Sequence, residues 1–358
     1  MSRFYPLAID TVRRETRDAV AVTFRVPSDL SDTFRYQQGQ HITLRTKMEG
    51  EDVRRSYSIC SGAQDNRLRI AIKRVPGGRF SNWANEHLAP GQVVEVMPPV
   101  GHFNVPLAPA NRKHYVAFAA GSGITPILSL VKTTLAAEPQ SEFTLFYGNR
   151  ASSTVMFKEE LEDLKDTYLG RFNLVFILSR EQQDIDLFNG RITREKCDAL
   201  FHHWVDLADV DAVFICGPAG MMGEVQAALD QRGFDKSRVK VEIFATSLPR
   251  KGAVQHAHPV VGANECEVTV IQDGRRRTFA LEKNSEPILE AALKQGIELP
   301  YACKGGICAT CRAKLVEGEV DMDSSFALED YEVARGFVLS CQSYPVTDKV
   351  TLDFDQDT

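Results

Sequence analysis

The sequence contains no apolar run that approaches the roughly 18 residues of a membrane-spanning helix. Its first residues, MSRFYPLAIDTVRRETRD, lack the apolar core of a signal peptide, and the chain has no internal repeats or low-complexity segments. We therefore expect a cytoplasmic protein. In that compartment thiols stay reduced, so clustered cysteines favour metal binding over disulfides.

Motifs of oxygenase-type metal centres are also absent. The sequence has neither HExxH nor the E-x-x-H pairs of a di-iron centre, so we expect no oxygenase site in this chain. What is present is the composition of an ordinary globular protein, 43% hydrophobic and 25% charged. A length of 358 residues predicts two or three domains rather than one core.

Charge is distributed unevenly along the chain. Residues 265–358 hold 18 Asp and Glu against 10 Lys and Arg, whereas residues 1–264 hold 30 against 32. Nucleic acid is a poor partner for the acidic segment, because phosphates would be repelled. The charge instead favours a protein partner with a basic docking face, and solubility alone is the alternative explanation.

Residues 1–110 are predicted to form a first domain made of strands. Short stretches rich in β-branched residues, separated by Gly, Pro, Asn and Asp, are typical of a small antiparallel barrel or sandwich. The predicted strands are 19–27, 39–46, 54–60, 66–75 and 91–99.

Residues 111–245 alternate apolar strands with helices, which predicts a parallel sheet covered by helices on its faces. The strands are expected at 114–121, 143–149, 172–179, 211–217 and 239–245, and the helices at 124–138, 158–169 and 222–233. Residues 246–264 have no periodicity and are interpreted as a linker. Residues 265–358 return to strands, with one helix at 286–295.

Four cysteines of the last segment form the pattern C-x4-C-x2-C-x29-C, which is typical of a plant-type [2Fe–2S] cluster. The predicted ligands are Cys303, Cys308, Cys311 and Cys341. Structural zinc usually takes two C-x2-C-like pairs, and only one is present. The segment 265–358 is similar to plant-type ferredoxins, which implies a β-grasp fold.

The loop between these cysteines is built from small residues. Gly305 and Gly306 permit unusual backbone angles, so the loop can wrap tightly around inorganic sulfide. Ala309 and Thr310 are expected to leave backbone N–H groups free to point at sulfur.

A second group of residues lies in the first domain, on and after a predicted strand. Arg55 and Tyr57 share one face of that strand, and a cation beside an aromatic ring suits a flat ligand that bears phosphate. Ser81 is expected to cap a following helix, whose N-terminus attracts anions. On composition alone, however, a surface strand and turn is the better explanation.

The order R-x-Y-S and then G-x-x-S resembles the flavin site of the ferredoxin–NADP reductase superfamily. This resemblance implies that Arg55 pairs with the flavin pyrophosphate, Tyr57 stacks on the isoalloxazine and Ser58 lies near the reactive nitrogen. The flavin could be FAD or FMN, and the intact G-x-x-S segment favours FAD. The further flavin contacts that the resemblance implies are Lys73, Val75, Gly78 and Ser81.

Two glycine-containing loops, 119–126 (AAGSGITP) and 216–222 (CGPAGMM), follow predicted parallel strands. The first is not a full G-x-G-x-x-G and is weak alone, but ligands bind where both loops lie, at the carboxyl ends of the strands. The superfamily resemblance implies that the first loop holds a dinucleotide and that Cys216 lies near the nicotinamide; a buried core thiol is the alternative. The residues carried over are Gly121, Gly123, Thr125, Pro126, Cys216, Gly217 and Pro218.

The choice between NADH and NADPH depends on guanidinium groups, which the 2′-phosphate of NADPH favours. Arg150 follows one predicted strand, and Ser179 and Arg180 follow the next. A Ser-Arg pair at that place resembles the 2′-phosphate site of NADP-type members, so we expect NADPH. Arg150 could instead pair with Glu159 or Glu160 on the nearby helix.

The stretch VEIFATS resembles the E-x-F terminus of related reductases and would place Glu242 and Phe244 beside the flavin. The alternative is an ordinary last strand with Phe244 in the core. With Ser58 and Cys216, these two residues complete the predicted catalytic set.

The order flavin, nicotinamide, [2Fe–2S] predicts an electron-transfer reductase. A flavin accepts two electrons together and releases them one at a time, so it belongs between nicotinamide and cluster. The domain order and stretches such as YACKGGICATC resemble one subgroup, the reductase subunits of phenylacetyl-CoA epoxidases, which implies a di-iron oxygenase as acceptor. A reductase for a Rieske-type or other oxygenase, often with FMN and NADH, is one alternative, and an iron–sulfur redox sensor is another.

Overall fold

A computed structural model describes residues 4–244 and 264–356 of the chain. Of these, residues 5–53 and 57–244 belong to a larger compact unit, and residues 264–356 belong to a smaller one. Of the predicted linker, residues 246–264, only Asn264 is described. Among the described residues, no helix is long and apolar enough to span a membrane.

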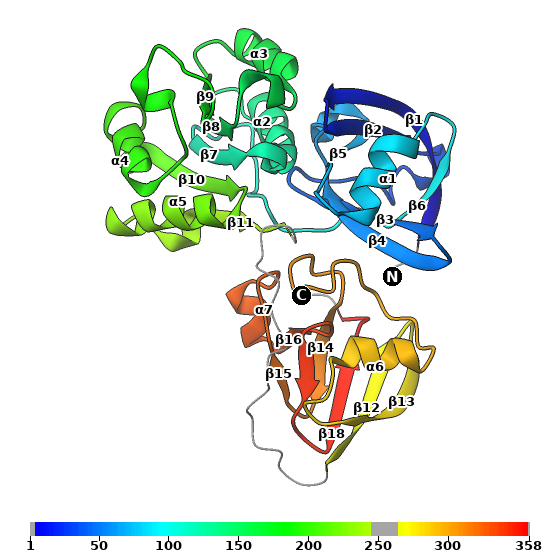
Figure 1. The fold of residues 1–358 in the computed structure, drawn as a ribbon. Coiled ribbons are helices and arrows are strands. Elements are labelled where there is room, and N and C mark those ends of the chain that lie inside the picture. The colour runs from blue at the N-terminus through cyan, green and yellow to red at the C-terminus, as the bar shows by residue number, and fades with distance from the viewer. Residues whose placement is uncertain (1–3, 245–263, 357–358) are drawn as a thin grey trace. The chain divides into compact units, whose positions relative to one another are not determined.

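The first sheet of the larger unit has six strands in the order β4-β3-β6-β1-β2-β5 (Figure 1). Their bounds are β1 Tyr5–Thr16, β2 Ala19–Arg25, β3 His41–Met48, β4 Glu51–Ser58, β5 Leu68–Lys73 and β6 Val93–Val96. Ile59, directly after β4, bridges Ile70 in β5, so the two edges of the sheet meet. The predicted antiparallel barrel is therefore confirmed.

Strand β1 was not among the predicted strands. Its second half, DTVRRET, is polar, and only Thr16 of this half is buried. Strand β1 is nevertheless central, because it pairs with both β2 and β6. Helix α1 (Arg79–His87) packs Phe80 and Ala84 into the barrel core.

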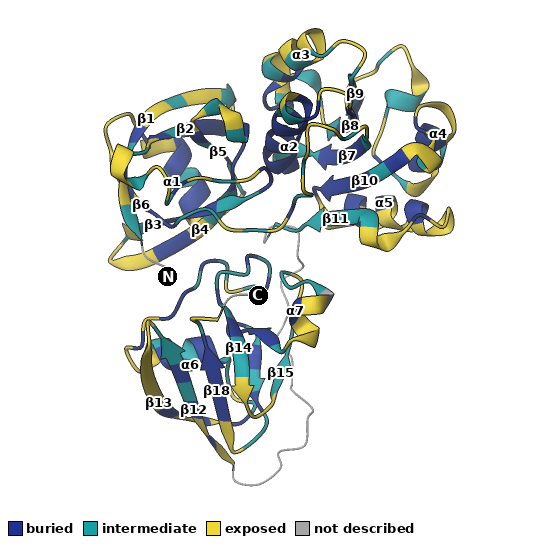
Figure 2. Ribbon diagram, turned by 180° about the vertical axis from the view of Figure 1, so that it is seen from behind, coloured by how far each residue is buried: buried dark blue, intermediate teal, exposed yellow. Residues whose placement is uncertain are grey.

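The second sheet is parallel, in the order β11-β10-β7-β8-β9, as predicted. The strands are β7 His114–Ala120, β8 Glu142–Asn149, β9 Phe172–Leu178, β10 Val210–Cys216 and β11 Val239–Glu242. Helices α2 (Ile124–Ala137) and α3 (Lys158–Thr167) cover one face, and α4 (Arg194–His203) and α5 (Ala219–Gln231) cover the other. Figure 2 shows the strands buried between these helices, which explains their nearly continuous apolar sequences.

Polar contacts join the barrel to the second sheet's helices within the larger unit. The Ser129 hydroxyl of α2 donates to the Ser61 carbonyl at 2.7 Å, and Thr133 of α2 accepts the Ala63 N–H at 3.0 Å. Arg69 of β5 forms an ion pair with Glu160 of α3 at 2.8 Å, and both side chains are largely buried. These contacts fix the end of β4 relative to the loop that precedes α2.

The smaller unit contains a five-stranded sheet in the order β13-β12-β18-β14-β16 and a two-stranded sheet of β15 and β17. The strands are β12 Glu265–Gln272, β13 Arg275–Glu282, β14 Arg312–Glu317, β15 Val320–Met322, β16 Phe337–Leu339, β17 Ser343–Pro345 and β18 Lys349–Asp353. Helix α6 (Ile288–Lys294) packs Ile288 and Leu289 onto the main sheet, as a β-grasp fold requires, and the prediction is confirmed. The short helix α7 (Asp330–Ala334) was not predicted.

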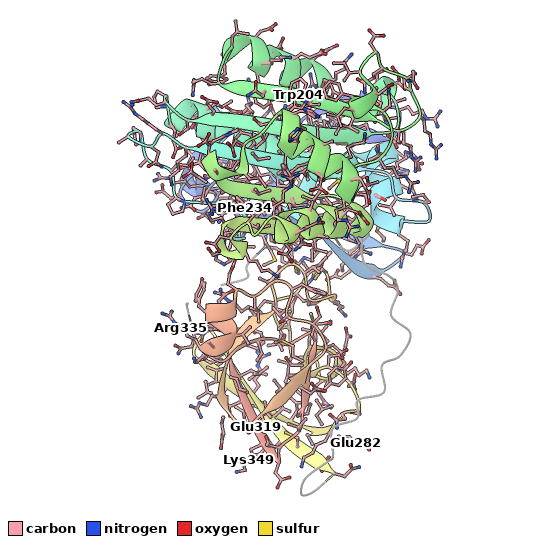
Figure 3. The ribbon with its side chains drawn as sticks, turned by 90° about the vertical axis from the view of Figure 1, so that its left-hand side faces the viewer. Trp204, Phe234, Glu282, Glu319, Arg335 and Lys349 are labelled. Atoms are coloured by element: carbon pink, nitrogen blue, oxygen red, sulfur yellow. The ribbon has the colours of Figure 1, made fainter. Side chains whose placement is uncertain are left out.

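The four predicted cluster ligands lie at one end of this unit. Cys311 immediately precedes β14, and Arg312 of β14 pairs with Leu339 at the end of β16, two residues before Cys341. Figure 3 labels Glu319 and Lys349 toward the opposite end of this unit. A Cβ on Gly318, the residue before Glu319, would lie 2.0 Å from the Lys349 carbonyl oxygen.

Candidate functional site

The carboxyl end of the parallel sheet brings together three of the predicted catalytic residues. Cys216 is the last residue of β10, and Glu242 is the last residue of β11 and pairs with it in register. The Ser58 hydroxyl, at the end of barrel strand β4, donates to Glu242 Oε1 at 2.8 Å. The ends of β10 and β11 in the parallel sheet and the end of β4 in the barrel therefore meet at a single place.

The electrostatics of this place favour neutral groups. Burial raises the pKa of Glu242 to about 7, although the hydrogen bond from Ser58 lowers it. Burial, and secondarily Glu242, raises the pKa of the Cys216 thiol well above its usual value. Glu242 Oε2 is buried and has no hydrogen-bond partner among the described residues, which fits a site that a bound flavin or nicotinamide completes.

Phe244 follows β11 and packs, partly buried, against the core that contains Cys216. Its placement agrees equally with a role beside the flavin and with the alternative of an ordinary core residue. The catalytic role of Phe244 therefore stays a prediction.

The loop before α1 contains the predicted phosphate contacts Gly78 and Ser81, but Ser81 does not cap the helix as expected. Helix α1 begins at Arg79, with Gly78 as N-cap, so Ser81 lies inside its first turn. The Ser81 hydroxyl accepts the Val75 N–H at 3.0 Å instead. A Cβ on Gly78 would lie 2.7 Å from Ser81 Oγ and 3.1 Å from the Val75 carbonyl oxygen, so glycine lets this turn close tightly.

The other predicted flavin residues lie on strands β4 and β5. Tyr57 on β4 is half-buried, and its ring contacts Phe80 of α1 at 5.8 Å between centroids. Arg55 is exposed, and its guanidinium donates to the Arg54 carbonyl at 2.7 Å. Lys73, at the end of β5, faces Asp18 at 3.7 Å. An exposed cation two residues from a half-buried ring is compatible with binding a phosphate-bearing aromatic ligand.

The two glycine loops of the parallel sheet touch each other. A Cβ on Gly123 would lie 2.1 Å from the Cys216 carbonyl oxygen, and one on Gly217 would lie 3.2 Å from the Ala120 amide nitrogen. Gly121 has a positive φ of 55°, and its carbonyl accepts the hydroxyl of the fully buried Tyr147 at 2.9 Å. Thus the loops are packed backbone to backbone at the end of the sheet, where a dinucleotide would bind.

The remaining residues of these loops are placed as follows. Thr125 and Pro126 are buried in the first turn of α2, where the Thr125 hydroxyl donates to the Ser122 carbonyl at 3.0 Å. Pro218 is exposed and is the N-cap of α5. Tyr147 was not predicted as a site residue, because an aromatic residue in an apolar strand gives no sign that its hydroxyl supports a loop.

The structure also brings together the arginines predicted to read the 2′-phosphate. The Arg180 N–H donates to the Arg150 carbonyl at 2.7 Å, and the Ser179 N–H donates to the Asn149 carbonyl at 3.0 Å. Both arginines are exposed, and neither side chain has an ion-pair partner within the described part of the chain. The alternative partner Glu160 binds Arg69 and Lys132 instead.

The four cluster cysteines form two close pairs. Contact with the Cys308 thiol, followed by burial, raises the pKa of Cys303, and Cys311 contacts Cys341 in the same way. Within residues 4–244 and 264–356, no three His, Cys, Asp or Glu side chains converge as a site for a single metal ion. Two pairs of thiols fit a two-iron cluster, in which four cysteines serve two irons.

Backbone amides of the cysteine loop point at two of these sulfur atoms. The Gly305 N–H lies 3.3 Å from Cys303 Sγ, and the N–H groups of Ile307 and Gly306 face Cys303 and Cys341. The expected donation from the amides of Ala309 and Thr310 stays a prediction. The glycines of the loop therefore supply donors as well as space.

Three family models match successive parts of the chain. They are an "Oxidoreductase FAD-binding domain" over residues 6–105, an "Oxidoreductase NAD-binding domain" over 118–227 and a "2Fe-2S iron-sulfur cluster binding domain" over 270–346. The chain belongs to the family of ferredoxin–NADP reductase-type oxidoreductases that carry a C-terminal [2Fe–2S] ferredoxin domain.

Within this family, the chain is 46% identical to a subunit of the 1,2-phenylacetyl-CoA epoxidase of Escherichia coli (strain K12), over 99% of each chain. It is 32% identical to the ferredoxin reductase component of 3-ketosteroid-9-alpha-monooxygenase from Rhodococcus rhodochrous, over 99% of this chain and 97% of that one. The solved structure of phthalate dioxygenase reductase covers 98% of both chains with a TM-score of 0.58 and 23% identity, which supports the fold.

Proposed function

We propose that the chain is the reductase subunit of a multicomponent oxygenase and that it passes electrons from NADPH through FAD and [2Fe–2S] to a di-iron oxygenase acting on phenylacetyl-CoA. The observation that carries the proposal is the 46% identity to the Escherichia coli epoxidase subunit over 99% of both chains. The three sites described above support it, because they occur in one chain and suit the three groups that such a path needs.

The bound groups supply hydride transfer from NADPH to FAD and single-electron transfer to the cluster. The chain binds and orients them. Gly123 and Gly217 let the two loops at the carboxyl end of the parallel sheet pack against each other, and Gly78 lets the turn before α1 close tightly on Val75 and Ser81. The pKa of Glu242 is about 7, so its carboxyl group can hold a proton near neutral pH. Its hydrogen bond with the Ser58 hydroxyl places this proton close to the predicted meeting place of flavin and nicotinamide.

NADPH rather than NADH is proposed because of the residues after β8 and β9. Arg150 and Arg180 present two guanidinium groups from adjacent strand ends. In NAD-type sites an acidic side chain usually binds the ribose hydroxyls. Here the acidic neighbour, Glu181, accepts the N–H and hydroxyl of Ser152 at 2.7 and 2.9 Å, so its carboxylate is already engaged.

The acceptor is proposed to dock on the acidic ferredoxin domain with a basic face. Residues 265–358 hold 18 acidic side chains against 10 basic ones, and this supports the choice, because opposite charge speeds the encounter of two proteins. The dependence on charge predicts that raised salt slows transfer to the acceptor more than it slows reduction of the flavin.

Reconstitution with the oxygenase subunits of a phenylacetyl-CoA epoxidase tests the proposal. We expect NADPH oxidation to be coupled to epoxidation of phenylacetyl-CoA, and stopped-flow spectra to show reduction of the flavin and then of the cluster. Failure of NADPH to reduce the flavin, or of the flavin to reduce the cluster, would contradict the reductase assignment.

A second candidate function is electron delivery to a different oxygenase, and the 32% identity to the steroid monooxygenase component supports it. Normal cluster reduction without electron delivery to the epoxidase would favour it.

A further inference from the structure

Gln342 follows the fourth predicted cluster ligand and is partly buried. Its side-chain nitrogen Nε2 lies 2.7 Å from the carbonyl oxygen of Cys341 and 3.1 Å from that of Lys304. The same nitrogen lies 3.7 Å from Cys341 Sγ. One side chain therefore touches the loop of the first three cysteines, the backbone of the fourth and its sulfur.

The orientation of this amide follows from its neighbours. All three contacted atoms are hydrogen-bond acceptors, so the NH₂ group faces them and the amide oxygen does not. The contact with sulfur is longer than the contacts with oxygen, as sulfur's larger radius requires. The two N–H bonds are thus shared between two carbonyls and a thiolate ligand.

The stem of Gln342 is held firmly by its surroundings. Its backbone N–H donates to the Leu339 carbonyl at 2.8 Å, and its carbonyl accepts the Asp323 N–H at 3.0 Å. Gly306, with a φ of +73°, lies so close that a Cβ there would be 3.0 Å from Gln342 Cγ. The backbone and Cγ of Gln342 are therefore held in place, with the amide beside Cys341.

A fixed N–H donor beside a thiolate ligand affects the redox equilibrium of the cluster. Reduction adds one negative charge, and a donor stabilises the more negative form more strongly. Hydrogen bonds to the cysteine sulfurs are among the features that set the reduction potentials of iron–sulfur clusters. Removing such a donor should lower the potential.

We propose that Gln342 is a positioning residue of the [2Fe–2S] cluster and that its amide N–H raises the reduction potential of the cluster through Cys341. The inference rests on the proposed electron path, in which a higher cluster potential favours transfer from flavin to cluster. A purely structural bridge between Lys304 and Cys341 would also hold the loop, but it would leave the potential of an intact cluster unchanged.

Redox titration of the full-length holoprotein tests this inference. The cluster is titrated with dithionite and followed by electron paramagnetic resonance in wild type, Gln342→Met and Gln342→Glu. We expect Gln342→Met to shift the one-electron equilibrium about tenfold toward the oxidised cluster, which is about 59 mV. Gln342→Glu should shift it further, because a carboxylate adds negative charge. The control Gln295→Met changes an exposed glutamine at the C-terminus of α6 and should match wild type.

Equal potentials in all four proteins with intact clusters would overturn the inference. If the Gln342 variants fail to retain the cluster, wild type labelled with ¹⁵N at glutamine side chains decides. A hyperfine coupling between the reduced cluster and a glutamine nitrogen, seen by electron spin echo envelope modulation, supports the contact, and its absence contradicts it. Dithionite replaces NADPH in these measurements, so they stay interpretable even if the proposed NADPH-to-cluster path fails.

Discussion

The cysteine site and the strand-end site of this protein are built in opposite ways. Three of the four predicted cluster ligands, Cys303, Cys308 and Cys311, lie within one short loop, and amides of this loop face the sulfur atoms of Cys303 and Cys341. In contrast, Ser58, Cys216 and Glu242 come from three separate strands and meet only where those strands end. A local site depends on spacing along the chain, whereas an assembled site depends on the packing of two sheets.

This difference predicts that each site can be damaged without the other. Cys308→Ser removes one thiolate, so the absorbance of the cluster should be lost completely while NADPH still reduces the flavin at an unchanged rate. Cys266→Ser alters a buried cysteine of the same unit that is not a predicted ligand, and it should keep the cluster. Simultaneous loss of cluster and flavin reduction in Cys308→Ser would show that the two sites are not independent.

The converse experiment breaks the assembled site. Gly123→Ala places a Cβ 2.1 Å from the Cys216 carbonyl, so two backbone segments must separate. We expect a loss of about 2–4 kcal/mol in the free energy of unfolding and weakened NADPH binding, with the cluster spectrum unchanged.

A matched glycine on α5 provides the control. A Cβ on Gly223 meets nothing within 4 Å, so Gly223→Ala should be neutral or slightly stabilising. Urea unfolding and isothermal titration with NADPH measure both variants. If Gly123→Ala binds and unfolds like Gly223→Ala, the contact between the two loops does not determine the site.

Glu242 allows a test of the charge balance in the assembled site. Its pKa is raised to about 7 in the folded chain from an ordinary value of 4.5, so the folded state holds an extra proton between these values. Stability should therefore fall as pH rises through this window, and Glu242→Gln should become more stable than wild type above pH 7 by roughly 1–3 kcal/mol. Thermal unfolding at pH 5 and pH 8 measures this change. Parallel pH dependence in both proteins would contradict the raised pKa.

The smallest expected effect concerns specificity at the edge of the assembled site. Arg180→Ala removes a guanidinium from the proposed 2′-phosphate contact, so KM for NADPH should rise roughly tenfold while KM for NADH stays constant, since one charge-assisted hydrogen bond contributes about 1.5–3 kcal/mol. Arg232→Ala, at the far end of α5 where Arg232 binds Asp198, should change neither. Steady-state kinetics with both nucleotides measures the ratio, and equal rises in both KM values would contradict the assignment.

Strands and helices with a strong hydrophobic pattern were predictable from the sequence. Those that depend on pairing or packing with other elements were not. Strands such as β7 and β10 are continuously apolar because both faces are covered by helices. Strand β1 was not predicted, since its polar second half forms a strand by pairing with β2, while β6 pairs with its first residues, Tyr5–Ala8. The short helices α4 and α7 were not predicted either. They lack a long apolar stripe, and packing against neighbouring elements stabilises them.

The site residues divide in the same way. Ser81 has the residue type of a helix cap, but the chain turns so that Gly78 takes that position and Ser81 binds the Val75 N–H instead. Arg150 had a possible acidic partner nearby in sequence, but Glu160 is engaged by Arg69 and Lys132 from other elements. Sequence spacing suggests possible partners, and only packing selects among them.

The sequence by itself determined the spacing of the four cysteines, the alternation of strands and helices, and the glycines of the loops, because spacing, periodicity and the lack of a Cβ are properties of the chain. Tertiary structure alone decided that Ser58 reaches Glu242, that Cys216 lies beside it and that Gln342 spans the two cysteine segments. These contacts join residues that are distant in sequence or turned by a particular loop. Their energies, including the raised pKa of Glu242, come from burial that only the folded chain creates.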